Sequence, residues 1–137
     1  MNVKVLVAYD GSEQARRALD WAAHMARDGS TVGVIGVAPT LAASPRIADA
    51  VDPRSDVTEH RRQVDEAAAI LAASGVDAAT MLKIGNPAEE IINAAQDGGF
   101  DVILVGIRGM GAVERFLIGS VADRLVRYAT VPVLVVR

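Results

Sequence analysis

Five short apolar runs, separated by segments of a different character, most restrict how this chain can fold. Their residues are mainly apolar and often β-branched, with little of the polar alternation that marks a strand with one face in water. Such runs are typical of parallel strands buried on both faces. Strands are therefore expected at Val3–Ala8, Thr31–Val37, Asp77–Ile84, Asp101–Val105 and Pro132–Val136.

The segments between these runs carry apolar residues at helical spacing. Helices are expected over residues 15–26, 54–74, 86–97 and 120–128, with a proline-containing loop over residues 39–53. Alternating strands and helices with right-handed crossovers leave few topologies. We therefore predict an α/β fold with a five-stranded parallel sheet, doubly wound in the strand order 3-2-1-4-5, with helices on both faces. Residues 1–137 are expected to form a single domain.

The composition argues against several classes of function. The net charge is −3 and no basic stripe with interleaved aromatic residues is present, so we expect no nucleic-acid binding. The absence of cysteine excludes disulfides, thiolate catalysis and cysteine-zinc sites. No apolar run has the length of a membrane span, and the first residues do not resemble a signal peptide. We expect a cytoplasmic protein with no membrane contact.

The predicted strand order places a ligand site at one end of the sheet. Strands 1 and 4 would be neighbours, with the chain winding in opposite directions on either side of them. Ligands of open α/β sheets bind beyond the carboxyl ends of the strands at such a position. The loops that leave strands 1 and 4 are Asp10-Gly11-Ser12 and Gly106–Gly119, so we expect the site between them.

The second of these loops is rich in glycine, in the pattern Gly106-x2-Gly109-x9-Gly119-Ser120. The spacing is not that of the GxGxxG fingerprint, and no Gly-Lys-Ser/Thr sequence supplies the lysine of a P-loop. The pattern still fits a phosphate cradle. Gly106 would let the chain turn sharply, while Gly109 and Gly111 would adopt positive φ and bring N–H groups close to an anion.

The residues that flank this loop add helix amides and positive charge. Gly119 and Ser120 open a helix whose free N–H groups and dipole favour an anion. The Ser120 hydroxyl can donate to a phosphate oxygen, and Arg108 and Arg115 can supply positive charge. The alternative is a flexible loop with glycine caps, in which Ser120 is an ordinary N-cap.

Three stretches together resemble the universal stress protein family along essentially the whole chain: VAYDGS at the end of the first strand, the glycine spacing above, and the closing VPVLVVR. The resemblance implies a five-stranded α/β fold that binds ATP in the ATP-binding branch, usually as a homodimer. Members without the glycine motif tend not to bind nucleotide, whereas this chain has the motif complete. We therefore expect ATP, together with Mg²⁺, as the ligand.

The resemblance also assigns roles to residues of the glycine-rich loop. Gly106 would lie beside the ribose. The residues that would hold the phosphates are, by position, Gly109, Gly119, Ser120 and Val121.

Two residues outside the loop complete the expected site. Asp10 and Val37 would hold the adenosine end, with the main chain of Val37 at the adenine edge. The Asp10 carboxylate fits as an acceptor for adenosine groups or as an outer ligand of phosphate-bound Mg²⁺. Its alternative role is that of a turn residue or cap before the first helix. Ile107 departs from the family pattern, because many members have a short polar residue there.

Strand 5 would lie at an edge of the sheet. Pro132 suits the start of an edge strand, and an apolar edge invites pairing with another copy. We therefore expect a symmetric homodimer through Val133–Val136, and the family pattern agrees.

Other polar and aromatic residues receive no ligand-binding role. His24 and His60 are far from the glycine-rich loop in sequence and lack a partner at metal-ligand spacing, so surface or packing roles are expected. Trp21 is expected to be packed in the interior. No metal site built from protein residues alone is expected.

These expectations combine into a dimeric, nucleotide-dependent sensor or regulator in a stress response. No catalytic residue is assigned, because we find no P-loop lysine, no second carboxylate for a metal and no base for water. At most, slow ATP hydrolysis or self-phosphorylation is expected. The alternatives are a stress-related protein-interaction scaffold in which nucleotide is incidental, and an adenylating enzyme, for which the short chain supplies no substrate domain.

Overall fold

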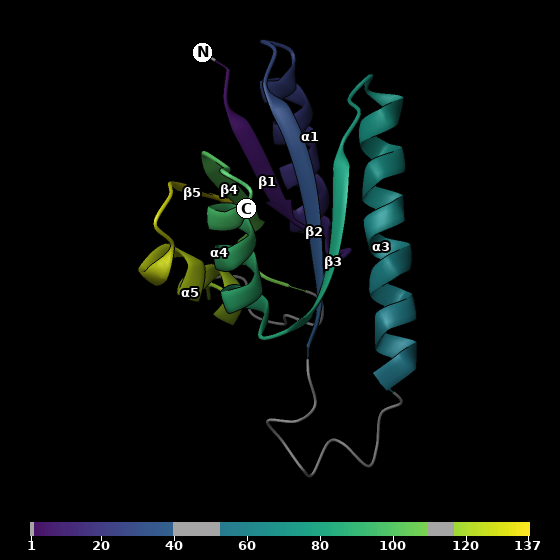
Figure 1. Cartoon of the computed structure of the whole chain (residues 1–137), viewed down its shortest axis with the longest axis vertical. Helices are drawn as coiled ribbons and strands as arrows, with labels where there is room; N and C mark the ends of the chain where they lie inside the picture. Colours follow the sequence, from purple (N-terminus) through teal and green to yellow (C-terminus); the bar gives the residue numbers. More distant parts are fainter. Residues whose placement is uncertain (1, 40–52, 110–116) are drawn as a thin grey trace.

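The structure is a computed structural model, and it describes residues 2–39, 53–109 and 117–137. Within these residues, parallel strands form one sheet in the order β3-β2-β1-β4-β5. The predicted α/β fold and its strand order are therefore confirmed (Figure 1). The strands are β1 (Lys4–Ala8), β2 (Thr31–Pro39), β3 (Ala79–Gly85), β4 (Val102–Gly106) and β5 (Val133–Val136).

Two of the helices are capped at their N-termini by polar side chains. The Ser12 hydroxyl accepts a hydrogen bond from the N–H of Ala15, and the Asn86 side chain accepts one from the N–H of Glu89. None of the described helices is long and apolar enough to cross a membrane. The helices are α1 (Glu13–Ala26), α3 (Pro53–Ala73), α4 (Pro87–Asp97) and α5 (Ser120–Tyr128).

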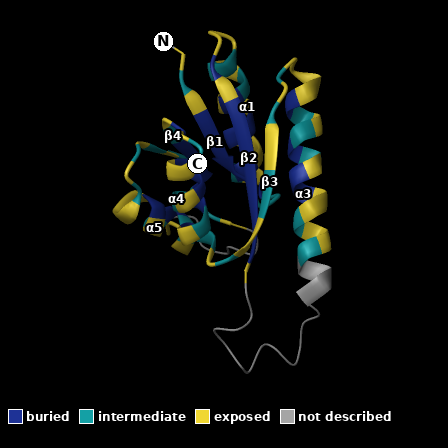
Figure 2. Ribbon diagram, in the orientation of Figure 1, coloured by how far each residue is buried: buried dark blue, intermediate teal, exposed yellow. Residues whose placement is uncertain are grey.

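Helices cover both faces of the sheet because successive side chains of a strand point to opposite sides. On one face, Val5 and Val7 of β1 pack in a core with residues of α1 and α3. On the other face, Leu6 and Ala8 pack with residues of α4 and α5. Figure 2 shows β1 and β2 as the buried centre of the molecule. The carboxyl ends of β1 and β4 consequently lie side by side, between the two layers of helices.

The two edge strands are more exposed than the central ones. Much of β3 is exposed in Figure 2, and Ile84 has 58% of its surface accessible to solvent. The expectation that all five strands are buried on both faces is therefore wrong for the edge strands β3 and β5, because neighbouring elements cover them less completely than the central strands. At the opposite edge, Leu134 of β5 is 40% exposed.

The prediction that Trp21 packs in the interior is also wrong. Its side chain is 52% exposed and lies edge-on to the ring of His24, with ring centroids 6.3 Å apart. The buried face of α1 is instead formed by small and aliphatic residues, namely Ala15, Ala18, Leu19 and Ala22. Residue 21 lies outside this stripe, and its side chain lines a surface pocket together with Val136 and Arg137 at the end of β5.

Candidate functional site

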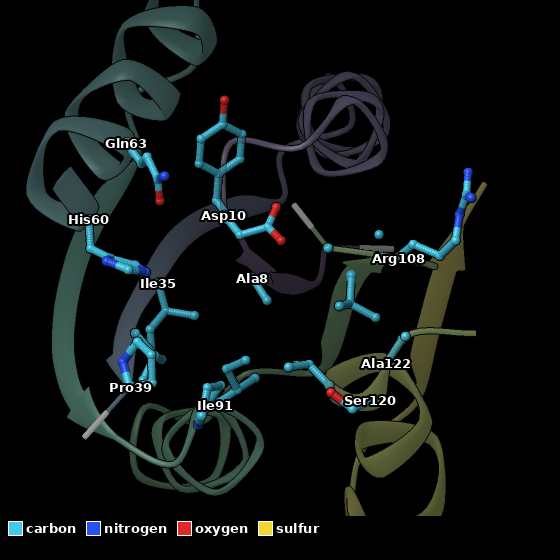
Figure 3. Close-up of a pocket in the computed structure, with 18 residues that line it drawn as sticks. Ala8, Asp10, Ile35, Pro39, His60, Gln63, Ile91, Arg108, Ser120 and Ala122 are labelled. Atoms are coloured by element: carbon cyan, nitrogen blue, oxygen red, sulfur yellow. The ribbon is translucent and has the colours of Figure 1, made fainter. Parts of the chain in front are cut away.

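A pocket of about 560 Å³ lies at the carboxyl ends of β1, β2 and β4 (Figure 3). It lies at the position where the winding direction of the sheet changes, which is the usual place for a ligand in this type of fold. Its volume is in the range of sites for small molecules. All eight residues that the sequence assigned to a binding site line it: Asp10, Val37, Gly106, Arg108, Gly109, Gly119, Ser120 and Val121.

One part of the pocket wall is apolar. Its side chains come from β1, β2, β4 and α4, and none of them carries a hydrogen-bonding group. An apolar wall of this kind suits the face of an aromatic ring system. The residues of this wall are Ala8, Ile35, Val37, Pro87, Ile91 and Val105.

The main chain of Val37 provides polar groups at the border of the apolar wall. The N–H of Tyr9 donates to the carbonyl of Ile35, so the main-chain groups of Ile35 point toward β1. Main-chain groups alternate in direction along a strand, so those of Val37 point the same way. The β1–β2 pairing ends at Ala8 and Ile35, and Val37 lies beyond it. Its N–H and C=O are therefore directed to the pocket side of the sheet.

The glycines of the loop after β4 do not have the conformation expected from the sequence. Positive φ was expected at Gly109, but φ at this residue is not positive. A Cβ here would lie 2.7 Å from Oδ2 of Asp10, so a larger residue would displace that carboxylate. The second glycine expected to have positive φ, Gly111, lies outside the described residues, as does Arg115.

Gly106 and Gly119 are also surrounded by protein atoms. A Cβ on Gly106 would lie 2.9 Å from Cβ of Gln14 and 3.0 Å from the main-chain nitrogen of Ala15, at the start of α1. A Cβ on Gly119 would lie 3.2 Å from Cα of Arg108. The three glycines thus allow β4, α1 and the two ends of the loop to approach each other closely around the pocket.

The first turn of α5 presents main-chain N–H groups to the pocket. Gly119 is the N-cap residue, and it has no side chain with which to cap this helix, in contrast to Ser12 at α1. Ser120 is the first helical residue, so it does not have the alternative role of N-cap. The first intrahelical bond runs from Asp123 N–H to the Gly119 carbonyl, at 2.9 Å. The N–H groups of residues 120–122 precede that bond, and all three residues line the pocket.

Asp10 links the loop after β1 to the loop after β4. Its Oδ1 accepts a hydrogen bond from the N–H of Ser12 at 2.9 Å, which is the turn-forming role considered as an alternative. Its Oδ2 faces Gly109 and is not part of that turn. Among the described residues, no group of three or more His, Cys, Asp or Glu side chains could hold a metal ion. A cation at this site would need ligands from a bound molecule in addition to Asp10.

Arg108 lines the pocket, but its side chain does not point into it. In Figure 3 its guanidinium extends away from the pocket centre, whereas Ser120 lies at the pocket wall. The structure therefore brings the main chain of Arg108 to the site. In this conformation, the positive charge expected there is directed elsewhere.

Residues of α3 complete the pocket, and the sequence did not point to them. His60, expected to have a surface or packing role, lies on the pocket wall together with Gln63 (Figure 3). Both are more than twenty residues from either loop in sequence, so spacing carried no information about them. One signal was available: Gln63 is a polar residue on the buried face of a helix, next to Val64.

Tyr9 forms part of the wall between α1 and α3. Burial raises the pKa of its phenol above the ordinary value, so the group is neutral at physiological pH. The Nε of Arg16 lies 3.4 Å from the Tyr9 oxygen, and the same guanidinium pairs with Glu66 of α3 at 2.8 Å. This chain of contacts connects α1 and α3 beside the pocket.

The comparisons with known proteins give one family. The sequence model of the universal stress protein family matches residues 1–137. Universal stress protein YxiE of Bacillus subtilis is 32% identical over 145 residues, which covers 98% of each chain.

Solved structures show the same likeness. The hypothetical protein MJ0577 has a TM-score of 0.85 at 26% identity, covering 99% of this chain and 96% of that one. The universal stress protein of Archaeoglobus fulgidus, solved in complex with dAMP, has a TM-score of 0.75 at 25% identity, covering 100% of this chain and 98% of the other. The likeness extends over the whole fold, including the elements that form the pocket.

Proposed function

The chain belongs to the universal stress protein family, and we propose that it binds ATP in the pocket described above. In this proposal, the protein acts as a nucleotide-dependent regulator in a stress response. The Archaeoglobus fulgidus relative, whose structure contains dAMP, supports an adenine nucleotide as the ligand.

The observation that carries this proposal is an apolar wall and a set of main-chain N–H groups in one pocket. The apolar wall suits the faces of the base, and the N–H and C=O of Val37 can read its edge. At the other end, the N–H groups of residues 120–122 in the first turn of α5, together with the loop residue Gly109, suit the phosphates, because helix N-termini favour anions. The N–H of Gly119 instead donates to the Ile107 carbonyl at 2.6 Å, which holds the two ends of the loop together. Asp10 and Gly106 also line the pocket and would flank the ribose.

A divalent cation would be held chiefly by the phosphates. Mg²⁺ commonly combines phosphate oxygens and water with one or two carboxylates, and Asp10 supplies a carboxylate oxygen that faces the glycine-rich loop. We propose binding rather than catalysis as the main activity. Phosphoryl transfer requires several charged groups around the reacting phosphate, and Asp10 is the carboxylate among the described lining residues.

The first prediction tests the ligand class. Adenine offers a donor and an acceptor at its N6 and N1 edge, which match the C=O and N–H of Val37, whereas guanine offers the reverse pattern. Isothermal titration calorimetry is expected to show binding of ATP, with GTP weaker by about tenfold or more. Native mass spectrometry of the freshly purified protein provides a second reading of bound nucleotide. Equal affinity for the two nucleotides would contradict the assignment of the base to Val37.

We also propose a homodimer through β5. The carbonyls of Pro132 and Val136 accept hydrogen bonds from β4, so alternate residues of β5 direct their main-chain groups toward β4. The N–H and C=O of Val133 and Val135 therefore point away from the sheet. An exposed edge with apolar residues such as Leu134 supports pairing with a second copy.

Replacement of Val135 by proline tests this interface. Proline removes an outward N–H while leaving the bonds from β4 to residues 132 and 136 intact, and it is tolerated on edge strands. Sedimentation velocity at micromolar concentration is expected to show a dimer for the wild type and a monomer for Val135→Pro. Val135→Ala keeps the N–H and serves as the matched control, expected to remain dimeric. A monomeric wild type would refute the proposed dimer.

A protein-interaction scaffold is the alternative function. It requires no nucleotide, so a wild-type protein that dimerises but binds neither ATP nor ADP in calorimetry would favour it. The uncapped amides of α5 at the pocket favour the nucleotide-binding function instead.

A further inference from the structure

Gln63 of α3 has a feature that the proposed roles of the other pocket residues do not explain. Its side chain lines the pocket and is only 8% exposed. Its Oε1 is closed to solvent and has no hydrogen-bond partner among the described residues. Buried polar groups in native proteins nearly always have a partner, so such an oxygen calls for one.

The orientation of the Gln63 amide is set by its neighbours. Its Nε2 donates to Oε1 of Glu59 at 3.5 Å, and the Glu59 carboxylate is held by Arg62 at 2.6 and 3.0 Å. The hydrogen bond from Arg62 lowers the pKa of Glu59, so this carboxylate is charged at neutral pH. The reversed amide would place its oxygen against a negative charge. The nitrogen therefore faces Glu59, and the acceptor oxygen is left for another donor.

The amide lies at a particular corner of the pocket. Its Nε2 is 3.4 Å from the Cβ position of Gly11, the residue that follows Asp10. Gln63 therefore lies beside the loop after β1, and both Gln63 and Asp10 line the pocket. Figure 3 shows Gln63 and His60 on the α3 side of the pocket and Ser120 on the other side. The corner is thus separate from the α5 amides that suit the phosphates.

We propose that Oε1 of Gln63 accepts a hydrogen bond from a ribose hydroxyl of the bound nucleotide, and that the site therefore prefers ribonucleotides to deoxyribonucleotides. The inference rests on the proposed nucleotide binding. With the base at Val37 and the phosphates at α5, the sugar is the part of the ligand left for the corner formed by Asp10 and Gln63. A ribose hydroxyl is the donor that the oxygen lacks. Because this oxygen is closed to solvent, the side chain must turn toward the pocket on binding, at the cost of the long 3.5 Å contact of its Nε2 with Glu59.

The test compares ATP, 2′-deoxyATP and 3′-deoxyATP by isothermal titration calorimetry, with the wild type and Gln63→Met. The wild type is expected to bind ATP about three- to tenfold more tightly than one of the deoxy analogues, the effect of one neutral hydrogen bond. Gln63→Met removes the acceptor at similar volume, and is expected to bind ATP and both analogues equally. Gln96→Met is the matched control, since the Gln96 amide donates to Thr130 away from the pocket, and it should retain the preference.

The outcomes separate this inference from the proposed function. A wild type that binds all three nucleotides equally overturns the role of Gln63, while nucleotide binding stands; this comparison needs no variant. A preference that persists in Gln63→Met, or in Gln63→Leu should the methionine variant not fold, also overturns it. Inosine triphosphate, which differs from ATP in the base, is the last ligand to be measured. If Gln63→Met changes the ratio of the affinities for ATP and inosine triphosphate but not the ratios for the deoxy analogues, the oxygen faces the base and the ribose assignment is wrong. A wild type without any ATP binding refutes the proposed function itself.

Discussion

Replacement of Gly119 by valine is expected to reduce the affinity for ATP by about 100-fold. A Cβ at this position would lie 3.2 Å from Cα of Arg108 and 3.3 Å from the carbonyl oxygen of Ile107. These are main-chain atoms that cannot rotate away, so a branched side chain would push the two ends of the loop apart. Displaced N–H groups would lose about two charge-assisted hydrogen bonds to the phosphates, together about 3 kcal/mol, which corresponds to the expected factor.

The added side chain would meet the protein's own loop, and the loss would come from moving the amides rather than from filling the anion position. Calorimetry with ATP measures the effect, and circular dichroism confirms that the variant is folded. Tyr128→Val, at the exposed far end of α5, is the control and should bind as the wild type does. If a folded Gly119→Val protein binds ATP with wild-type affinity, the loop does not take part in ATP binding.

Replacement of Gly106 by alanine is expected to lower the free energy of unfolding by about 2–3 kcal/mol, the upper part of the usual range for overpacking. A Cβ there would lie 2.9 Å from Cβ of Gln14 and 3.0 Å from the main-chain nitrogen of Ala15. Relief requires that α1 move away from β4, where the two elements pack against each other. Chemical denaturation measures the change, and the melting temperature should fall by roughly 6–15 °C.

Gly99→Ala provides the comparison that separates space from backbone conformation. Gly99 has a φ of +66° and no atoms within 4 Å of its Cβ position. Alanine is therefore expected to cost only about 1 kcal/mol there, from the unfavourable φ alone. If Gly106→Ala costs no more than Gly99→Ala, close approach of α1 is not the reason for glycine at position 106.

Much of the fold could be predicted because it follows from local patterns. Apolar runs such as Val102–Gly106 are typical of buried strands, and helical segments between them favour parallel pairing with right-handed crossovers. The order β3-β2-β1-β4-β5 and the position of the pocket between the loops after β1 and β4 follow from that topology. The exposure of β3 and of Trp21 was missed, because it depends on how far neighbouring elements extend over them.

The candidate site was predicted in location but not in its packing. The glycine spacing indicated that something approaches the backbone closely, and the neighbours proved to be Asp10 beside Gly109 and the start of α1 beside Gly106. Glycine tolerates both positive φ and close contact, so its presence in a sequence does not distinguish the two. Only the three-dimensional structure shows which of the two, positive φ or close contact, applies at a given glycine.

The topology and the two loops that meet at the pocket could be inferred without coordinates, because strand and helix periodicities and chain connectivity are local properties. The tertiary structure alone decided which side chains of α3 reach that pocket, and that the guanidinium of Arg108 turns away from it. Gln63 contacts the loop at Gly11, 52 residues earlier in the chain, through the packing of α3 against the sheet. Neither a repeat nor a residue spacing in the sequence indicates proximity over such a separation, since this proximity arises from the way whole helices pack.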